Sequence, residues 1–134
     1  MPGRAIRRPD TPPRQDSRRA WRPARLPGMA DACRKLVRDR IPEMIRAAGR
    51  HPVTRVLDEA GYQQALLDKG IEEATEAASA STASLPWELA DVLEVLRALT
   101  AAAGMSWEQL LTPTDDKRNR CGGFTGKVFL ESVE

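Results

Sequence analysis

The sequence predicts a small all-α protein, and three observations carry this prediction. The chain has 134 residues, a length that fits one domain whose small core is often completed by a partner subunit. From residue 35 onward, apolar residues recur at steps of three and four, which is the spacing of helices that bury one face. Proline, glycine and capping residues stand at the ends of these periodic stretches. Together these features predict a helical bundle.

Residues 1–32 differ in composition from the rest of the chain. They contain six of the ten prolines, and eight arginines against three aspartates, which is a local net charge of +5. Such a segment buries too little apolar area to offset the entropy of ordering. We therefore predict a disordered Pro/Arg-rich extension, followed by one helical domain over residues 33–134. Met29 lies just before the predicted helical domain, so the extension is interpreted as an upstream part of the coding frame. The alternative is a cationic targeting arm.

The charge and hydropathy of the chain exclude several classes of function. Subtracting the +5 of the extension from the net charge of +2 leaves about −3 for the helical domain, which argues against a nucleic-acid-binding face. No run approaches the roughly 18 apolar residues of a membrane span, and no secretory signal is present. We expect a soluble, cytoplasmic protein. Cys33 and Cys121 lack the spacing of a zinc site or a disulfide framework.

The first predicted helix lies between Lys35 and Gly49. Its apolar residues have helical spacing, at Leu36, Val37, Ile41, Met44 and Ile45. Pro42 is tolerated only near a first turn, and Gly49 ends the helix. Residues 51–56 are expected to form an extended connector, because Pro52 disfavours a helix before it and three of the residues that follow are β-branched.

Asp58 is expected to cap the second helix, which runs to about Ala80. The segment is rich in alanine, leucine, glutamine and glutamate, all of which favour helix. Its inward stripe is predicted to consist of Tyr62, Leu66, Gly70, Glu73, Ala77 and Ala80. One glutamate, Glu73, therefore falls on the core face.

The third predicted helix begins near Pro86 and ends at Gly104. Its apolar residues repeat at nearly heptad spacing, at Leu85, Leu89, Val92, Leu96, Leu99 and Ala103. Proline is well placed at a helix N-terminus, and a heptad-like stripe is typical of helices that pack along their length. Together with the small core of about a hundred residues, this stripe predicts a homodimer or a higher homo-oligomer.

The fourth predicted helix starts at a capping box formed by Ser106 and Gln109. Pro113 is expected to break or restart it, since proline lacks the amide hydrogen that a helix interior requires. Gly122 and Gly123 end the helix. Residues 124–130 alternate well enough to predict a short strand or hairpin.

Two successive predicted helices each carry acids three residues apart. Residues 71–76 read IEEATE and residues 87–91 read WELAD. Residues at this spacing share one helix face. If the helices pack antiparallel through a tight linker, Glu73 and Glu76 face Glu88 and Asp91, and four oxygen ligands meet. The competing interpretation is a solvated helix face, because EExxE is common on exposed helices.

Four clustered carboxylates require a cation to neutralise their charge, and a hard divalent cation can do so. Mg²⁺ prefers carboxylate and water oxygens and commonly shares its remaining positions with substrate phosphates. His51 is the only histidine of the chain and lies outside the acidic cluster, which disfavours mechanisms that rely on a histidine base. Water activated by a metal ion is the expected nucleophile.

These acids resemble a known family. The EExxE of Glu72, Glu73 and Glu76, followed by the ExxD of Glu88 and Asp91, is similar to the MazG-like and phosphoribosyl-ATP pyrophosphohydrolase-like superfamily. The resemblance includes KLVRDRIPEMI at residues 35–45, PVTRVLD at residues 52–58 and GGF at residues 122–124, which resemble a predicted house-cleaning branch. It covers roughly the last hundred residues.

The resemblance implies a MazG-like helical bundle, assembled as a dimer or larger oligomer, that hydrolyses nucleoside triphosphates between the α and β phosphates. By position, Glu73, Glu76, Glu88 and Asp91 would bind Mg²⁺, with Mn²⁺ as a substitute. Glu72 would orient water, act as a base or support the metal ligands, so Glu72 and Glu73 are the catalytic candidates.

Four basic residues are candidate phosphate ligands. Lys35 and Arg38 stand in the opening motif, and Lys117 and Arg120 precede the two glycines. Phosphoryl chemistry of this class relies on positioning and on neutralising charge, which cationic side chains provide. Two other functions stay open: a catalytically idle helical dimer that binds a nucleotide or a protein, and a nucleic-acid-associated protein that uses its Arg-rich extension. The second of these is disfavoured, because the extension has little aromatic interleaving.

Overall fold

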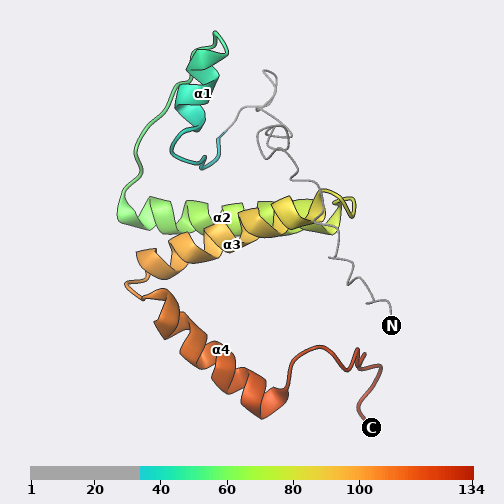
Figure 1. The fold of residues 1–134 in the computed structure, drawn as a ribbon. Coiled ribbons are helices and arrows are strands. Elements are labelled where there is room, and N and C mark those ends of the chain that lie inside the picture. The colour runs from blue at the N-terminus through green and yellow to red at the C-terminus, as the bar shows by residue number, and fades with distance from the viewer. Residues whose placement is uncertain (1–33) are drawn as a thin grey trace, which may run out of the picture. The chain divides into compact units, whose positions relative to one another are not determined.

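The structure, a computed structural model, describes residues 34–134, so the predicted extension over residues 1–32 lies outside the described residues. Four helices follow one another (Figure 1): α1 (Ile41–Ala47), α2 (Glu59–Ala78), α3 (Leu85–Ala102) and α4 (Trp107–Cys121). Within residues 34–134 there is no strand, and this confirms the all-α prediction for this part of the chain. None of its helices is long and apolar enough to span a bilayer.

Helix α1 is shorter than the sequence predicts. It begins only at Ile41, with Pro42 in its first turn, where the missing amide hydrogen of proline costs no helical hydrogen bond. The residues from 34 to 40 are not helical. The helix ends before Gly49, whose φ of 78° lies in the left-handed region that favours glycine. The connector over residues 51–56 has no regular structure, as predicted.

Helix α2 begins as the sequence predicts. The Asp58 side chain accepts a hydrogen bond from the backbone N–H of Gly61 at 2.8 Å, which satisfies one of the amides that a helix start leaves free. The predicted inward stripe is also found, because Leu66 and Glu73 are buried and Tyr62 is half-buried. A carboxylate therefore lies on the packed face of α2.

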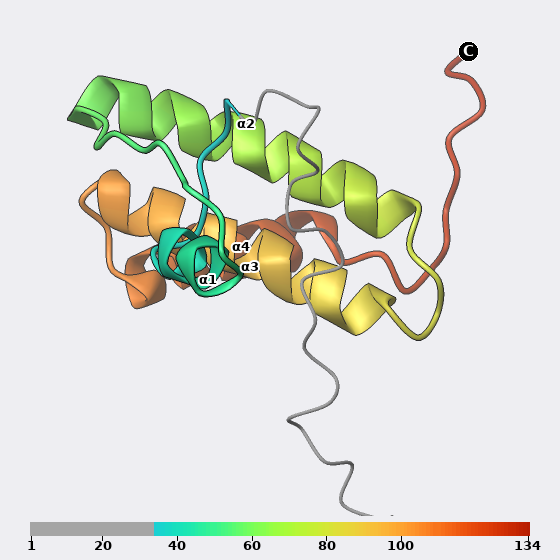
Figure 2. The same cartoon turned by 90° about the horizontal axis from the view of Figure 1, so that it is seen from above.

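Helices α2 and α3 pack against each other as an antiparallel pair (Figure 2). Residues 79–84 join them at one end. At the other end, the Gln63 side chain donates a hydrogen bond to the carbonyl of Ala102 at 3.3 Å. Leu66 and Val95 are the buried apolar side chains of the described residues, 3% and 6% exposed. This hairpin holds the predicted acids, and its apolar core is small.

Four of the five leucines of α3 lie off the buried face, whereas Val92 and Leu99 of the predicted stripe are half-buried. Val95 is buried, whereas Leu85, Leu89, Leu93 and Leu96 are 37–53% exposed. The predicted stripe placed three of these leucines on the packed seam. Helix α3 is apolar around most of its circumference, so the sequence pattern alone does not select the side that meets α2. We call these four side chains the leucine face.

Helix α4 is continuous, so the predicted break at Pro113 is wrong. Its capping box is formed as expected, and Pro113 lies inside the helix. Two threonine hydroxyls flank the proline: Thr112 donates to the carbonyl of Glu108 at 3.3 Å, and Thr114 donates to that of Leu110 at 2.9 Å. These bonds satisfy carbonyls of the preceding turn. Water reaches the carbonyl that Pro113 leaves free, because the helix is exposed around its middle.

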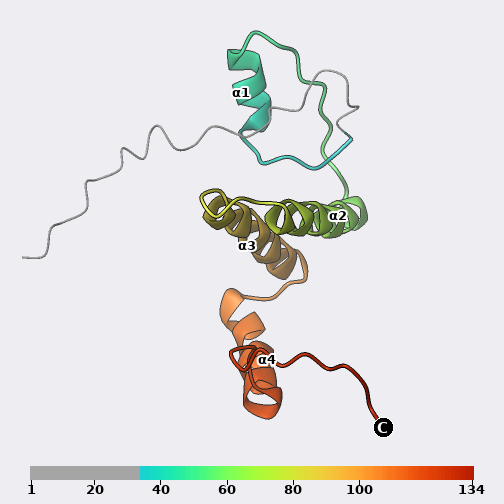
Figure 3. The ribbon, with the colours of Figure 1, turned by 90° about the vertical axis from the view of Figure 1, so that its right-hand side faces the viewer.

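The segment after α4, residues 122–134, forms no strand or hairpin ladder, which corrects the prediction for residues 124–130. Gly122 has a φ of 80° and turns the chain out of the helix. The backbone N–H of Lys127 donates to the carbonyl of Phe124 at 3.1 Å, which closes one turn. Figure 3 shows the rest of the segment as a plain trace. A strand requires a neighbouring strand to bond with, and the described residues offer none. We call residues 122–134 the C-terminal arm.

Candidate metal centre

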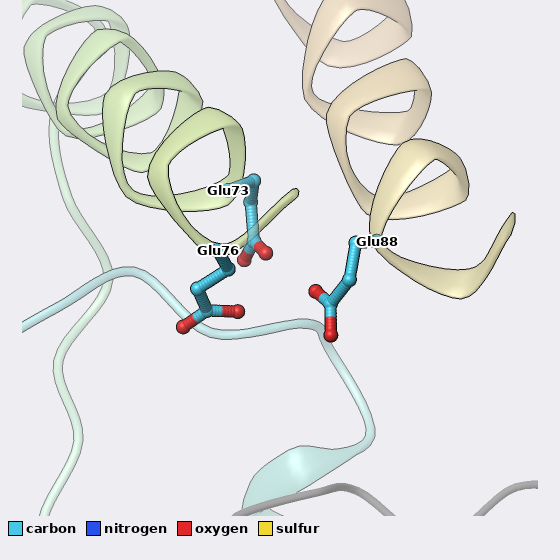
Figure 4. A group of neighbouring side chains, drawn as sticks. All are labelled: Glu73, Glu76 and Glu88. Atoms are coloured by element: carbon cyan, nitrogen blue, oxygen red, sulfur yellow. The ribbon is translucent and has the colours of Figure 1, made fainter. Parts of the chain in front are cut away.

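Three carboxylates meet where α2 ends and α3 begins. Glu73 and Glu76 come from the last two turns of α2, and Glu88 comes from the first turn of α3 (Figure 4). One oxygen of each lies within 4.8 Å of the others. The short linker of residues 79–84 brings the two helix ends together, so the antiparallel hairpin itself creates the cluster. Three oxygens at this spacing can share one cation.

Glu88 carries an unpaired buried atom. Its Oε2 is enclosed and has no hydrogen-bond partner in the described residues. Leaving a buried polar atom unsatisfied costs about 1–3 kcal/mol, and more for a charged group. The position of Glu88 near the positive end of the α3 dipole recovers only part of this cost. A ligand that binds this oxygen would remove it, and a hard cation is the ligand that carboxylate oxygens bind best.

Lys69 neutralises part of the acidic charge from one helical turn away. Its Nζ lies 2.9 Å from Glu73 Oε1 and 3.2 Å from Glu72 Oε2. Burial alone would lower the pKa of Lys69, but the hydrogen bond and the charge of Glu73, aided by Glu72, raise it overall. Lys69 therefore stays charged and compensates the buried Glu73 carboxylate.

The opening motif contributes two more cations. Lys35 Nζ lies 3.2 Å from Glu72 Oε1, and Arg38 donates to Asp91 Oδ1 at 2.6 Å. Both contacts join residues 34–40 to the acidic helices, one to α2 and the other to α3. Asp91 is therefore engaged by a guanidinium and is not one of the three grouped carboxylates.

The pKa values of two neighbouring acids shift in opposite directions. Burial would raise the pKa of Glu72, but the hydrogen bond from Lys35 and the charge of Lys69 lower it overall. Partial burial raises the pKa of Glu76, and the negative charges of Glu73, Glu72 and Glu88 raise it further. Glu72 is compensated by cations, whereas Glu76 faces other acids. The negative charge of the cluster thus gathers on the side of Glu76 and Glu88.

The charges of the cluster do not balance. Four carboxylates, Glu72, Glu73, Glu76 and Glu88, stand against the two cations Lys35 and Lys69, and the Arg38–Asp91 pair is neutral by itself. Two negative charges are left over, which is the charge that one divalent ion neutralises. Neither Glu76 nor Glu88 has an ion-pair partner among the described residues. The residues present therefore fit a hard divalent cation in charge and in donor type.

The structure brings together most of the predicted site residues but not all of them. Lys35 and Arg38 contact the acids Glu72 and Asp91, and their role as phosphate ligands stays a prediction. Arg120 instead pairs with Asp116 on its own helix at 3.2 Å, and Lys117 is exposed. No contact joins either residue to the acidic cluster within the described chain.

Sequence reasoning missed Lys69. Its spacing held the signal, because a lysine three and four residues before two glutamates lies on their helix face. The prediction considered cations only as ligands of phosphate, not as partners of the acids. Lys69 is nevertheless the most enclosed of the three cations, with 18% of its side chain exposed.

Comparisons with known proteins leave the family of this chain open. No protein-family model matches the chain, and no solved structure matches it. A protein from Mycolicibacterium smegmatis, described as an uncharacterized protein, is 54% identical over 48 residues, which make up 36% of this chain and 49% of that relative. The match thus spans about half the length of the relative.

Proposed function

We propose that this chain is a Mg²⁺-dependent nucleoside triphosphate pyrophosphohydrolase of the MazG-like type. It would cleave an NTP or dNTP between the α and β phosphates, releasing the monophosphate and pyrophosphate, and would act in house-cleaning of the nucleotide pool. The observation that carries the proposal is the group of three carboxylates with the buried, unpaired Glu88 Oε2. The sequence resemblance supplies the reaction and the substrate class.

Glu73, Glu76 and Glu88 would hold the metal ion, and Asp91 would join them. Asp91 has to exchange its bond with Arg38 for the ion. Mg²⁺, or Mn²⁺ in its place, supplies an activated water and neutralises phosphate charge when bound. The guanidinium that Asp91 releases is then free to meet a phosphate oxygen, which fits the prediction of Arg38 as a substrate ligand.

Glu72 fits a positioning role better than the role of a base. Lys35 and Lys69 both bind its carboxylate, and they lower its pKa. A general base works best when its pKa lies near the working pH, and these cations move Glu72 away from that range. Glu72 would instead hold Lys69 against Glu73 and keep Lys35 at the site, ready for a phosphate.

The alternative is a catalytically idle helical dimer that binds a nucleotide or a protein. A specific observation favours it: Lys69 and Arg38 already pair with Glu73 and Asp91, so these two acids need no metal ion. Glu76 and Glu88 distinguish the two proposals. No cation of the described chain neutralises their charge, so only these two acids need a metal ion. Direct binding of Mg²⁺ at millimolar concentration or below favours the hydrolase.

The test has two independent parts. Calorimetric titration measures Mg²⁺ binding, and a product assay distinguishes pyrophosphate from orthophosphate over a panel of ordinary and noncanonical NTPs and dNTPs. Glu73→Gln, Glu76→Gln, Glu88→Gln and Asp91→Asn should each lower pyrophosphate release by orders of magnitude, because each removes a charge but little volume. Circular dichroism should show an unchanged helical content.

Glu59→Gln is the matched control, since it makes the same change in the first turn of α2, at the opposite end from the cluster. It should keep wild-type metal binding and activity. Near wild-type rates in the four site variants would make the acids an ordinary helix surface. Release of orthophosphate would leave the metal site standing but overturn the reaction. Nucleotide binding without metal binding or hydrolysis would support the idle binder.

A further inference from the structure

The C-terminal arm exposes more apolar surface than any other segment of comparable length in the described chain. Phe124, Val128, Phe129, Leu130 and Val133 are 74–98% exposed. Aromatic side chains bury about 150–250 Å² each, so the two phenylalanines alone present roughly 300–450 Å² to water. Exposed contiguous apolar surface of this size marks an interaction site in a protein that has to stay in solution.

A second unpaired apolar surface lies on the same chain. The leucine face of α3 is only partly covered within one chain, because each of its four members is more than a third exposed. With 1.5 Å of rise per residue, it extends about 17 Å from Leu85 to Leu96. The extended part of the arm, from Val128 to Val133, covers about the same 17 Å at roughly 3.3 Å per residue. The two surfaces match in length.

Their chemistry matches as well. The arm carries one basic residue, Lys127, and two acidic residues, Glu131 and Glu134, around its apolar residues, and all three are exposed. None of the four members of the leucine face is charged, and Arg97, one turn after Leu93, is exposed at the edge of this face. Packing the arm on the leucine face would bury apolar groups without stranding a charge.

From these observations we propose that the C-terminal arm of one copy packs along the leucine face of a second copy. The occupant is a second copy because one chain carries both surfaces, so a two-fold exchange covers the arm and the leucine face of each copy. The arm does not cover the leucine face of its own chain, as the exposure of both shows. The two phenylalanines of the arm alone would supply roughly 300–450 Å² of the roughly 800 Å² that each partner contributes to a stable interface.

This inference does not rest on the proposed hydrolase activity. It gives a role to the C-terminal arm, which includes the residues predicted to form a strand. In the proposed interface, the arm packs on a second copy, whereas it contacts no such surface within its own chain. The interface would also explain the GGF of residues 122–124. Gly122 turns the chain out of α4, and Phe124 begins the apolar residues of the arm.

Cysteine cross-linking tests the contact. In full-length chains that carry Cys33→Ser and Cys121→Ser, Phe129→Cys is placed on one tagged copy, and Leu85→Cys, Leu89→Cys, Leu93→Cys or Leu96→Cys on a second copy with a different tag. A disulfide requires Cα atoms within about 7 Å. We expect a mixed-tag disulfide at one or two neighbouring leucine positions. Absence of mixed-tag disulfides at all four positions would overturn the proposal.

Sedimentation provides the second measurement, with two matched variants. Phe129→Ser removes an apolar side chain from the arm, and Val53→Ser removes one that is 99% exposed on the connector. We expect the dimer dissociation constant to rise at least tenfold for Phe129→Ser and to stay unchanged for Val53→Ser. A dimer unaffected by both changes would overturn the proposal. Equal weakening by both would indicate nonspecific apolar association and would overturn it as well.

Discussion

Lys69 is the residue whose removal most directly tests the electrostatics of the cluster. It pairs with the buried Glu73 at 2.9 Å, and breaking such a pair leaves a charge without compensation. We expect Lys69→Met to lower the free energy of unfolding by about 3 kcal/mol, the lower end for buried pairs, because the pair is not fully enclosed. Urea unfolding without divalent ions measures the loss.

Added Mg²⁺ should recover part of the stability of Lys69→Met, since a cation bound by Glu73 replaces the missing ammonium. The exposed Lys117→Met on α4 serves as the control and should change stability little in either condition. A Lys69→Met protein as stable as the wild type would mean that water already screens Glu73. An equal loss in the free energy of unfolding with and without Mg²⁺ would mean that Glu73 does not bind the metal ion.

Glu76 has the opposite balance, because acids surround it and raise its pKa above the ordinary value of 4.5. An acid with a raised pKa in the folded protein binds its proton more tightly there than in the unfolded chain. Ionisation of Glu76 therefore lowers the free energy of unfolding as the pH rises from below 4.5 through the raised pKa of the folded protein. In the presence of a chelator, Glu76→Gln should remove this loss. The gain at neutral pH should stay below about 1 kcal/mol, because the group is largely exposed.

Thermal unfolding of wild type and Glu76→Gln, measured with chelator at acidic and at neutral pH, checks this expectation. The two proteins should be alike in acid and should diverge toward neutral pH. A Glu76→Gln protein that is less stable at neutral pH would show that the carboxylate has a stabilising partner.

At the scale of single residues, three of the four acids that the sequence predicts to meet do so, whereas Asp91 pairs with Arg38 instead. The spacing of Glu73, Glu76 and Glu88 followed from helix geometry and one tight linker, both of which are local. The bond between Arg38 and Asp91 joins residues 53 positions apart, and no periodicity records such a contact. The spacing of Lys69 from Glu72 and Glu73 does indicate an ion pair on one helix face, but the prediction considered only the acids of this motif.

Among the helices, α4 gives the clearest test, because a proline lies in its interior. Proline costs about 3 kcal/mol relative to alanine inside a helix. Pro113→Ala should restore the amide that bonds the carbonyl one turn earlier, and it should slow hydrogen exchange of the α4 amides. Protein stability should rise by less than the full figure, since the unfolded chain gains freedom when proline is removed.

Hydrogen exchange followed by mass spectrometry checks this helix by helix. The α2 amides serve as the internal control and should exchange as in the wild type. Faster exchange in α4 of Pro113→Ala would mean that proline holds the helix in a shape that packing elsewhere requires.

At the scale of elements, end signals were more reliable than interior ones. Asp58, the capping box of Ser106 and Gln109, and the terminating glycines were all predicted correctly, because each acts through a hydrogen bond or a φ angle of its own neighbourhood. The interior break at Pro113 was wrong, since an exposed helix can leave one carbonyl to water. The start of α1 was misplaced because Leu36 and Val37 continue an apolar pattern without continuing the helix.

For the whole molecule, the small core predicts that folding and association are linked. If two copies share an interface through the C-terminal arm, each tenfold rise in protein concentration adds about 1.4 kcal/mol per mole of dimer. The melting temperature should then rise by roughly 3–5 °C per tenfold increase. Differential scanning fluorimetry over two decades of concentration measures this.

Phe129→Ser should flatten the dependence on concentration, and Val53→Ser should keep it. A melting temperature independent of concentration in the wild type would show that the monomer is stable by itself. At this scale the sequence predicted an assembly from the near-heptad leucines. That assembly stays a prediction, and the pattern could not place the leucines, because the side of α3 that faces α2 is decided by packing between helices rather than by the order of apolar residues.

The short linker between α2 and α3 has a consequence for the time course of folding. Contacts between residues close in the chain form first, because closing a short loop loses little entropy. The hairpin should therefore be an early structure, and its formation brings Glu76 and Glu88 together before the rest of the chain has packed. Their repulsion then opposes the step that starts folding. A divalent ion present at that moment would speed refolding, whereas one added later would only slow unfolding.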